Sequence, residues 1–161
     1  MNNSLPGAPR HQAILREVLK TYAEDDTILT IGVFGSVVRP DGDEFSDIDL
    51  DVTVPAESLT RASWQIQRLT SHLNAHGFPT LLVVRDGDNE AEILLASLDR
   101  IDLTIHAPET SKAEVLRDLV LFRGERSILP TEGTSAITPQ AAADRIQYLH
   151  DKMPLNALYV A

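Results

Sequence analysis

One stretch in which acidic and apolar residues alternate constrains this chain more than any other feature. Acids occupy every second position and aliphatic residues fill the places between them: Asp47, Asp49 and Asp51, with Ile48, Leu50, Val52 and Val54. Side chains of a β-strand point alternately to the two faces of its sheet, so the pattern predicts a strand with one core face and one acidic face. Carboxylates two positions apart lie about 7 Å apart at the backbone, and their side chains can converge on a pair of metal ions. An acidic face that is simply solvated is the alternative.

An apolar run rich in β-branched residues precedes this stretch and predicts a buried strand over residues 28–34. The run ends at Gly35 and Ser36, and ten residues separate Ser36 from Asp47. Glycine lets the backbone come close to a ligand, and serine adds a hydroxyl and an amide. If a short helix begins at Ser36, its N-terminus would also favour a phosphate. The sequence therefore predicts a phosphate-holding turn in front of paired metal-binding carboxylates.

Residues 28–106 resemble the DNA polymerase β-type nucleotidyltransferase superfamily, in which a Gly-Ser turn precedes an acid–hydrophobic–acid strand. Asp47 and Asp49 are the preferred acid pair because they follow Ser46 at the start of the strand. Asp49 with Asp51 is the alternative pair. The family also has a third carboxylate on a later strand, and Asp102, in the alternating run 100–106, is the candidate.

The resemblance implies catalytic and metal-binding roles for Asp47, Asp49 and Asp102, which would hold two Mg²⁺ ions. Asp102 would complete the metal site or act as the general base. Glu90 and Glu92 lie on a predicted hairpin and could also reach the acceptor, although surface positions are the simpler interpretation.

The nucleotide is expected to contact Gly35 and Ser36. Arg39 follows the turn where relatives often carry an arginine, and Pro40 replaces the glycine common there. A phosphate contact from Arg39 and a surface position for it are both open at this stage.

The implied reaction is the transfer of a nucleoside monophosphate from a nucleoside triphosphate, with ATP expected, to an acceptor hydroxyl. Small-molecule transferases that modify aminoglycoside or lincosamide antibiotics are the nearest analogy, so the chain is expected to be an enzyme linked to antibiotic resistance. Two alternatives stay open. One is a minimal transferase that modifies a partner protein, as in toxin–antitoxin pairs, and the other is a nucleotide-binding module without activity.

The net charge of −10, from 14 basic and 24 acidic residues, bears on the partner. Proteins that bind nucleic acid neutralise phosphates with clustered lysine and arginine, and this chain has no basic run. The composition therefore argues against a nucleic-acid substrate. A cationic small molecule would be attracted to an acidic cleft, although many soluble proteins are acidic for solubility alone.

The expected fold is α+β, a small mixed sheet flanked by helices, with a catalytic core over 1–106 and a helical C-terminal extension over 107–161. Helical spacing of apolar residues predicts helices at 9–25 and 58–77, at 111–123 after a capping box, and at 138–149. Turn residues at 86–89 predict a hairpin between strands 80–85 and 91–98. His72 and His76 are one helical turn apart, but with no third ligand of that type nearby, their placement at a helix C-terminus is favoured over a metal site.

The chain has no cysteine, so disulfides and thiolate metal sites are excluded. No long apolar segment precedes the core, so neither a signal peptide nor a membrane span is expected, and a cytoplasmic location follows. Residues 155–161 are mostly apolar, which predicts either a homodimer contact or a chain cut from a longer protein.

Overall fold

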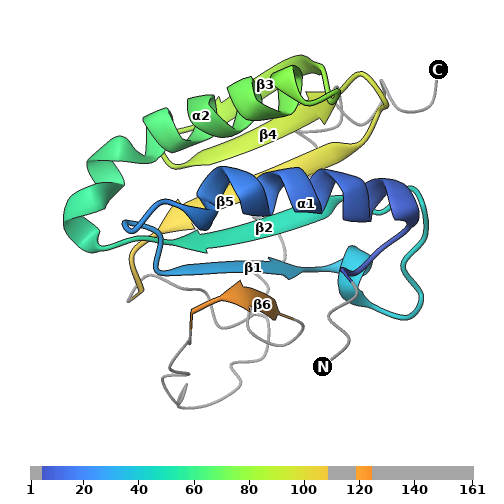
Figure 1. Cartoon of the computed structure of the whole chain (residues 1–161), viewed down its shortest axis with the longest axis horizontal. Helices are drawn as coiled ribbons and strands as arrows, with labels where there is room; N and C mark the ends of the chain where they lie inside the picture. Colours follow the sequence, from blue (N-terminus) through green and yellow to red (C-terminus); the bar gives the residue numbers. More distant parts are fainter. Residues whose placement is uncertain (1–4, 109–118, 125–161) are drawn as a thin grey trace, which may run out of the picture. The chain divides into compact units, whose positions relative to one another are not determined.

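The computed structural model describes residues 5–108 and 119–124, which form a six-stranded mixed sheet with two α-helices on one of its faces (Figure 1). The strand order is β3-β4-β5-β2-β1-β6. The elements are α1 (Pro9–Ala23), β1 (Thr30–Phe34), the 3-10 helix η1 (Ser36–Val38), β2 (Ile48–Thr53), the 3-10 helix η2 (Ala56–Arg61), α2 (Ala62–Ala75), β3 (Thr80–Asp86), β4 (Glu90–Leu95), β5 (Arg100–His106) and β6 (Val120–Arg123). The mixed α/β fold predicted for a nucleotidyltransferase is confirmed.

Both helices form where the apolar spacing predicts them. Pro9 begins α1, where a missing backbone N–H costs nothing, and Gly77 follows the end of α2 with φ 88°. Each helix buries one stripe against the sheet: Ile14, Leu15, Val18 and Tyr22 from α1, and Ala62, Ile66, Leu69 and Leu73 from α2. The helices run antiparallel, with contacts from Asp25 to Gln65 and from Glu17 to His72.

The core lies between these helices and the aliphatic face of the sheet. Ile48, Leu50 and Val52 of β2 are fully buried there, as the alternation predicts. The acidic positions of β2 must therefore project from the face that α1 and α2 do not cover.

The pairing of the central strands places functional side chains in one row. β2 pairs antiparallel with β1, opposing Asp49 to Phe34, and parallel with β5, opposing Asp49 to Asp102. β5 in turn pairs antiparallel with β4, which opposes Asp102 to Glu92. Because neighbouring strands are about 4.8 Å apart, Glu92, Asp102 and Asp49 are side-by-side carboxylates on three strands.

The hairpin of β3 and β4 is confirmed, but its second strand is shorter than predicted. β4 ends at Leu95, and Ala96–Leu98 belong to a turn in which Leu98 has a positive φ of 66°. The backbone N–H of Leu98 donates to the Leu95 carbonyl at 2.9 Å, so the chain reverses there and enters β5.

The helix predicted over 111–123 is wrong at its C-terminal end. Residues 120–123 form β6, which pairs antiparallel with the free edge of β1. The apolar run 120–122 suits a strand as well as a helix, and the open edge of β1 supplies the backbone partners that decide between them. The sheet thus includes four residues that the sequence assigned to the C-terminal extension.

The chain divides into two compact units, Met1–Ile128 and Leu129–Ala161. The second unit lies outside the described residues, as do the helix predicted at 138–149 and the apolar end at 155–161. The domain boundary at 106 and the homodimer therefore remain predictions. No helix in the described part of the chain has both the length and the apolar character that crossing a membrane requires.

Candidate active site

The turn after β1 is shaped by Gly35. Its φ of 77° and ψ of −154° are accessible mainly to glycine, and a β-carbon there would lie 2.1 Å from Oδ2 of Asp49. Ser36 then begins η1, which ends as the Arg39 N–H donates to the Ser36 carbonyl at 3.1 Å. The short helix considered from the sequence is present, although it has only three residues. The close approach that requires glycine is to the Asp49 carboxylate.

The three predicted acids come together across the sheet. Asp47 directly precedes β2, Asp49 lies within it, and Asp102 is the register partner of Asp49 on β5. The side chains of Asp47 and Asp102 are each 33% exposed, so this end of the row is accessible to a ligand. Asp49 and Asp102 are about fifty residues apart in sequence and become neighbours only through the parallel pairing of β2 with β5.

A cation that the sequence reading overlooked lies between these acids. The Arg100 guanidinium donates a short hydrogen bond from an Nη atom to Oδ2 of Asp47, and its Nε is 3.5 Å from Oδ1 of Asp102. The side chain of Arg100 is only 18% exposed. The sequence could have indicated this position, since Arg100 is two residues before Asp102 on the same strand and must share its face.

Burial, together with neighbouring carboxylates, raises the pKa values of two of the acids. Burial, reinforced by the neighbouring charges of Asp102 and Asp47, raises the pKa of Asp49 to about 7. Burial also raises the pKa of Asp47, and Arg100 opposes that rise. These acids resist ionisation unless a cation lies beside them. Their oxygen-only donor set and unfavourable mutual charge fit a hard divalent cation such as Mg²⁺.

Asp51 is set apart from the other acids. It is 2% exposed, and Nε2 of His106 lies 2.6 Å from its Oδ1. The other ring nitrogen of His106 is 2.9 Å from the Ala107 carbonyl. Both ring nitrogens of His106 therefore have partners, and Asp51 is its buried partner.

Glu92 lies nearer to the acids than a hairpin surface position would place it. It opposes Asp102 in the register of β4 and β5, one of its carboxylate oxygens is buried, and its charge contributes to the raised pKa of Asp47. Glu90, two positions earlier, opposes Thr104 instead. Of the two glutamates considered from the sequence, Glu92 is the one beside the predicted metal-binding acids.

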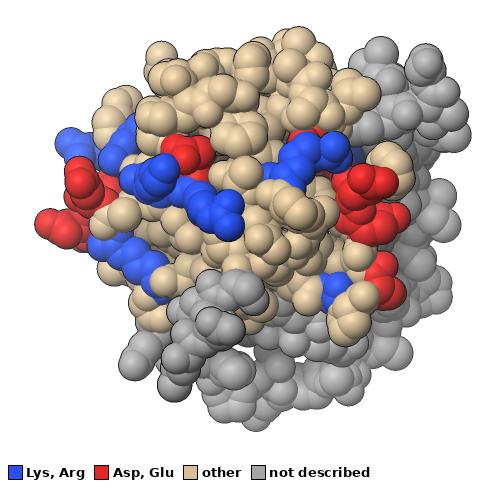
Figure 2. Space-filling view, turned by 45° about the vertical axis from the view of Figure 1, so that its right-hand side comes forward, with Lys and Arg blue, Asp and Glu red and all other residues tan. Residues whose placement is uncertain are grey.

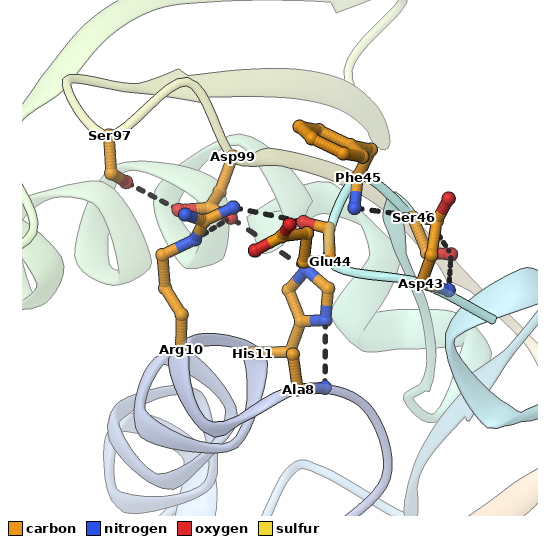
Figure 3. Close-up of polar contacts among 9 residues, drawn as sticks. All are labelled: Ala8, Arg10, His11, Asp43, Glu44, Phe45, Ser46, Ser97 and Asp99. Atoms are coloured by element: carbon orange, nitrogen blue, oxygen red, sulfur yellow. Dashed lines mark hydrogen bonds and ion pairs between the residues drawn. The ribbon is translucent and has the colours of Figure 1, made fainter.

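The loop that leads into Asp47 is held by polar contacts from three segments (Figure 3). Arg10 of α1 donates two hydrogen bonds. One runs from its Nε to Oδ1 of Asp99 at 2.6 Å, and the other from its Nη2 to the Glu44 carbonyl at 2.9 Å. Within the loop, Oδ1 of Asp43 accepts from the Phe45 N–H at 3.0 Å. These contacts fix the backbone immediately before Asp47.

Two further side chains complete the same network (Figure 3). Ser97 donates from Oγ to Oδ2 of Asp99 at 2.5 Å, and Nε2 of the buried His11 lies 3.7 Å from Oδ1 of the same carboxylate. The Ala8 N–H donates to Nδ1 of His11 at 3.2 Å, which leaves the ring proton on Nε2, facing Asp99. Asp99 therefore joins the start of α1 to the turn before β5.

Arg39 is half exposed, and its Nε lies 3.8 Å from Oδ1 of Asp41. Its positive charge is close enough to oppose the rise in the pKa of Asp49. On the face drawn in Figure 2, the basic side chains of the described residues lie in separate groups beside acidic ones and form no continuous basic surface. Such a surface would be expected for an extended nucleic-acid contact.

Comparisons with known proteins match one segment of the chain to a family model. Residues 14–92, nearly half of the chain, match the family model for the nucleotidyltransferase domain. The match includes the Gly35–Ser36 turn, Asp47 and Asp49, and it ends before Asp102. No similar protein was found among curated sequences.

Two solved structures are similar at low sequence identity. A cytoplasmic RNA terminal U-transferase has a TM-score of 0.43 and 18% identity, over 64% of this chain and 31% of that one. The Thermotoga maritima CCA-adding enzyme, in complex with tRNA, has a TM-score of 0.39 and 19% identity, over 64% of this chain and 22% of that one. The chain thus spans less than a third of the length of either structure.

The matched segment contains the turn and the first two acids in the order and on the strands that the family resemblance requires. Residues 14–92 match a nucleotidyltransferase domain, the kind of domain that the Gly-Ser turn and the acidic strand predict.

Proposed function

We propose that this protein transfers a nucleoside monophosphate from a nucleoside triphosphate to a hydroxyl group of a small-molecule acceptor, in a reaction that depends on Mg²⁺. The observation that carries the proposal is the row in which Asp49 and Asp102 oppose each other, with Asp47 next to Asp49 and the Gly35 turn packed against it. In this proposal Asp47, Asp49 and Asp102 hold the metal ions. Bound Mg²⁺ would neutralise the triphosphate and stabilise the charge that develops on the leaving group.

The nucleotide is assigned to the turn. The backbone of Gly35 and Ser36 borders the Asp49 carboxylate, so phosphates held there lie beside the acids. Arg39 follows the turn, and its half-exposed guanidinium is available to a phosphate oxygen. ATP is the nucleotide to try first.

In the reaction, the acceptor oxygen bonds to the α-phosphorus while the bond from that phosphorus to the bridging oxygen breaks, and pyrophosphate leaves. The proton of the acceptor hydroxyl passes to a carboxylate. Asp102 and Glu92 are adjacent in the register and are the two groups for that role. If Glu92 on β4 takes the proton, Asp102 can serve as a metal ligand.

A cationic acceptor suits the charge of the site. Glu92, Asp102 and Asp49 bring three carboxylates together, and the whole chain carries a net charge of −10. An amine-bearing acceptor such as an aminoglycoside would be attracted to such a surface, whereas a polyanionic acceptor, which lacks the Mg²⁺ that accompanies the triphosphate, would be repelled.

The experiment is incubation of the chain with Mg²⁺, each of the four nucleoside triphosphates labelled at the α-phosphate, and one of three acceptor sets. These are aminoglycosides and lincosamides, an RNA with a free 3′ hydroxyl, and a cell extract of proteins. We expect label to move to one antibiotic with release of pyrophosphate. Label on RNA or on a protein would overturn the small-molecule acceptor while keeping the transferase, and no transfer in any set would overturn both.

A further inference from the structure

A second group of potential metal ligands lies on the helical side of the sheet, away from the acids. His72 and His76 are one turn apart at the end of α2, and Glu17 of α1 faces them. One ligand atom from each of the three residues lies within 4.8 Å of the other two. The third ligand that the sequence did not offer is therefore supplied by the neighbouring helix.

The contacts within this group hold the three side chains together, and one imidazole must rotate out of the stack for both histidines to face one ion. Nε2 of His72 is 2.9 Å from Oε2 of Glu17, and the rings of His72 and His76 are stacked with centroids 3.9 Å apart and an interplanar angle of 19°. The other oxygen of Glu17, Oε1, accepts from Nζ of Lys20 at 2.6 Å. The lysine holds one carboxylate oxygen and leaves the second directed at the histidines.

The orientation of His76 leaves one ring nitrogen available. Its Nδ1 is 2.8 Å from the backbone carbonyl of His72, so Nδ1 carries the proton and Nε2 carries the lone pair. A hydrogen bond from one ring nitrogen to a backbone carbonyl is the usual way in which metal-binding histidines are oriented. The His76 N–H also donates to the His72 and Leu73 carbonyls, both at 3.1 Å, which fixes its backbone at the end of the helix.

The two helices that carry these side chains are held in register by other contacts. The hydroxyl of Tyr22 donates to the Gln65 carbonyl at 3.4 Å, and Gln65 donates to Oδ2 of Asp25 at 2.8 Å. Arg68 reaches the same oxygen of Asp25 at 2.6 Å. A ligand bound by Glu17 and the histidines would meet a framework that is already in place, which lowers the cost of binding.

We propose that Glu17, His72 and His76 bind one divalent transition metal ion of the Zn²⁺ class, and that the ion fastens α1 to the end of α2. Two imidazoles and one carboxylate form a donor set typical of Zn²⁺ and leave an open coordination position, whereas Mg²⁺ prefers oxygen ligands alone. The site is separate from the acids of the active site. β2 directs Ile48, Leu50 and Val52 toward the helices and its acids toward the other face.

The test uses the full chain carrying Asp47→Asn and Asp49→Asn, so that the active-site acids do not compete for the metal. After treatment with a chelator, Zn²⁺ is titrated by calorimetry, and Mg²⁺ is titrated separately. We expect one Zn²⁺ per chain, no heat from Mg²⁺, and a higher melting temperature with Zn²⁺. Removal of any one ligand by His72→Ala, His76→Ala or Glu17→Gln should weaken binding by more than about tenfold.

Matched controls separate this site from adventitious binding. Glu24→Gln removes an exposed carboxylate just past the end of α1, and His150→Ala removes a histidine outside the described residues. Both should bind Zn²⁺ as the parent does. The proposal is overturned if the parent binds no Zn²⁺, or if the control variants lose as much affinity as the ligand variants. Because the ligand variants keep Asp47 and Asp49 when made in the wild-type chain, their transferase activity with Mg²⁺ should be unchanged.

Discussion

Gly35 and Asp49 are fitted against each other, since a β-carbon at position 35 would lie 2.1 Å from Oδ2 of Asp49. The contact joins the turn after β1 to the acid in the middle of the proposed metal site. Any side chain at position 35 would displace the carboxylate, the turn or both.

Gly35→Ala is therefore expected to abolish transfer and to destabilise the fold by more than backbone strain alone. A non-glycine residue at positive φ costs about 1–2 kcal/mol, and displacement of Asp49 adds to that cost. Gly87→Ala is the matched control, because Gly87 has a similar φ of 72° and its β-carbon would meet nothing closer than 3.7 Å. Urea unfolding and the transfer assay on both variants check the prediction, and equal losses in the two would contradict it.

Asp47→Asn and Asp49→Asn should each abolish transfer while leaving the fold intact, because each removes a proposed metal ligand from a crowded acidic group. Asp51→Asn should show the opposite pattern. It weakens the buried hydrogen bond between Asp51 and His106, and a hydrogen bond to a charged group contributes about 1.5–3 kcal/mol. Melting curves and activity below the melting temperature distinguish the two patterns. Full activity in either of the first two variants would show that the metal site is assigned to the wrong acids.

The pKa of Asp49 predicts how the metal-free protein responds to pH. A group whose pKa is about 7 in the folded chain and 3.8 unfolded binds more protons in the folded state between these values. Its contribution to stability is therefore fully present below pH 3.8 and is lost as the pH rises toward 7. Asp49→Asn should remove this loss. When melting temperatures are measured with chelator present, the difference between the variant and the wild type should therefore be larger at pH 8 than at pH 5. A gain that does not depend on pH would contradict the raised pKa.

A nucleoside triphosphate should raise the melting temperature only in the presence of Mg²⁺ or Mn²⁺, because Asp47, Asp49 and Asp102 repel the phosphates when no metal is bound. At a hundredfold excess over the dissociation constant, binding stabilises the native state by about 2.7 kcal/mol. Differential scanning fluorimetry with and without chelator measures the effect. An equal rise in chelator would indicate a metal-independent binding module.

Glu92→Gln tests the acceptor side of the site. If Glu92 takes the proton of the acceptor, the variant should lower kcat by about 10²–10⁴-fold and flatten the acidic limb of the pH–rate profile. Its Mg²⁺-dependent thermal shift with nucleotide should remain. Glu90→Gln is the control on the same face of the same strand, opposite Thr104. An unchanged kcat in Glu92→Gln would leave Asp102 as the base.

The sequence predicted the part of the fold in which local periodicity and long-range packing agree. Alternation over residues 47–54 and 100–106 identified β2 and β5, and helical spacing identified α1 and α2. Residues 120–123 were assigned to a helix because their apolar spacing suits either structure, and only the edge of β1, about ninety residues earlier, decides for a strand.

The site shows the same division. The family resemblance implied roles for Asp47, Asp49 and Asp102, but the contact of Arg100 with two of them depends on which strands are neighbours. Likewise, Glu17 is separated from His72 by 55 residues, and no local pattern connects them. Single-sequence reasoning finds residues that share an element, whereas neighbours on different elements are determined by the tertiary pairing.

The parallel pairing of β2 with β5 places Asp102 beside Asp49, so only molecules with this register are expected to be active. A shift of β5 by one residue would turn Asp102 to the opposite face and bring Ile101 or Leu103 opposite Asp49. Such a molecule could keep much of its compactness and its helix content, yet it would lack the third carboxylate altogether. Specific activity per mole of chain should therefore report misregistered protein that circular dichroism and gel filtration do not distinguish from the native form.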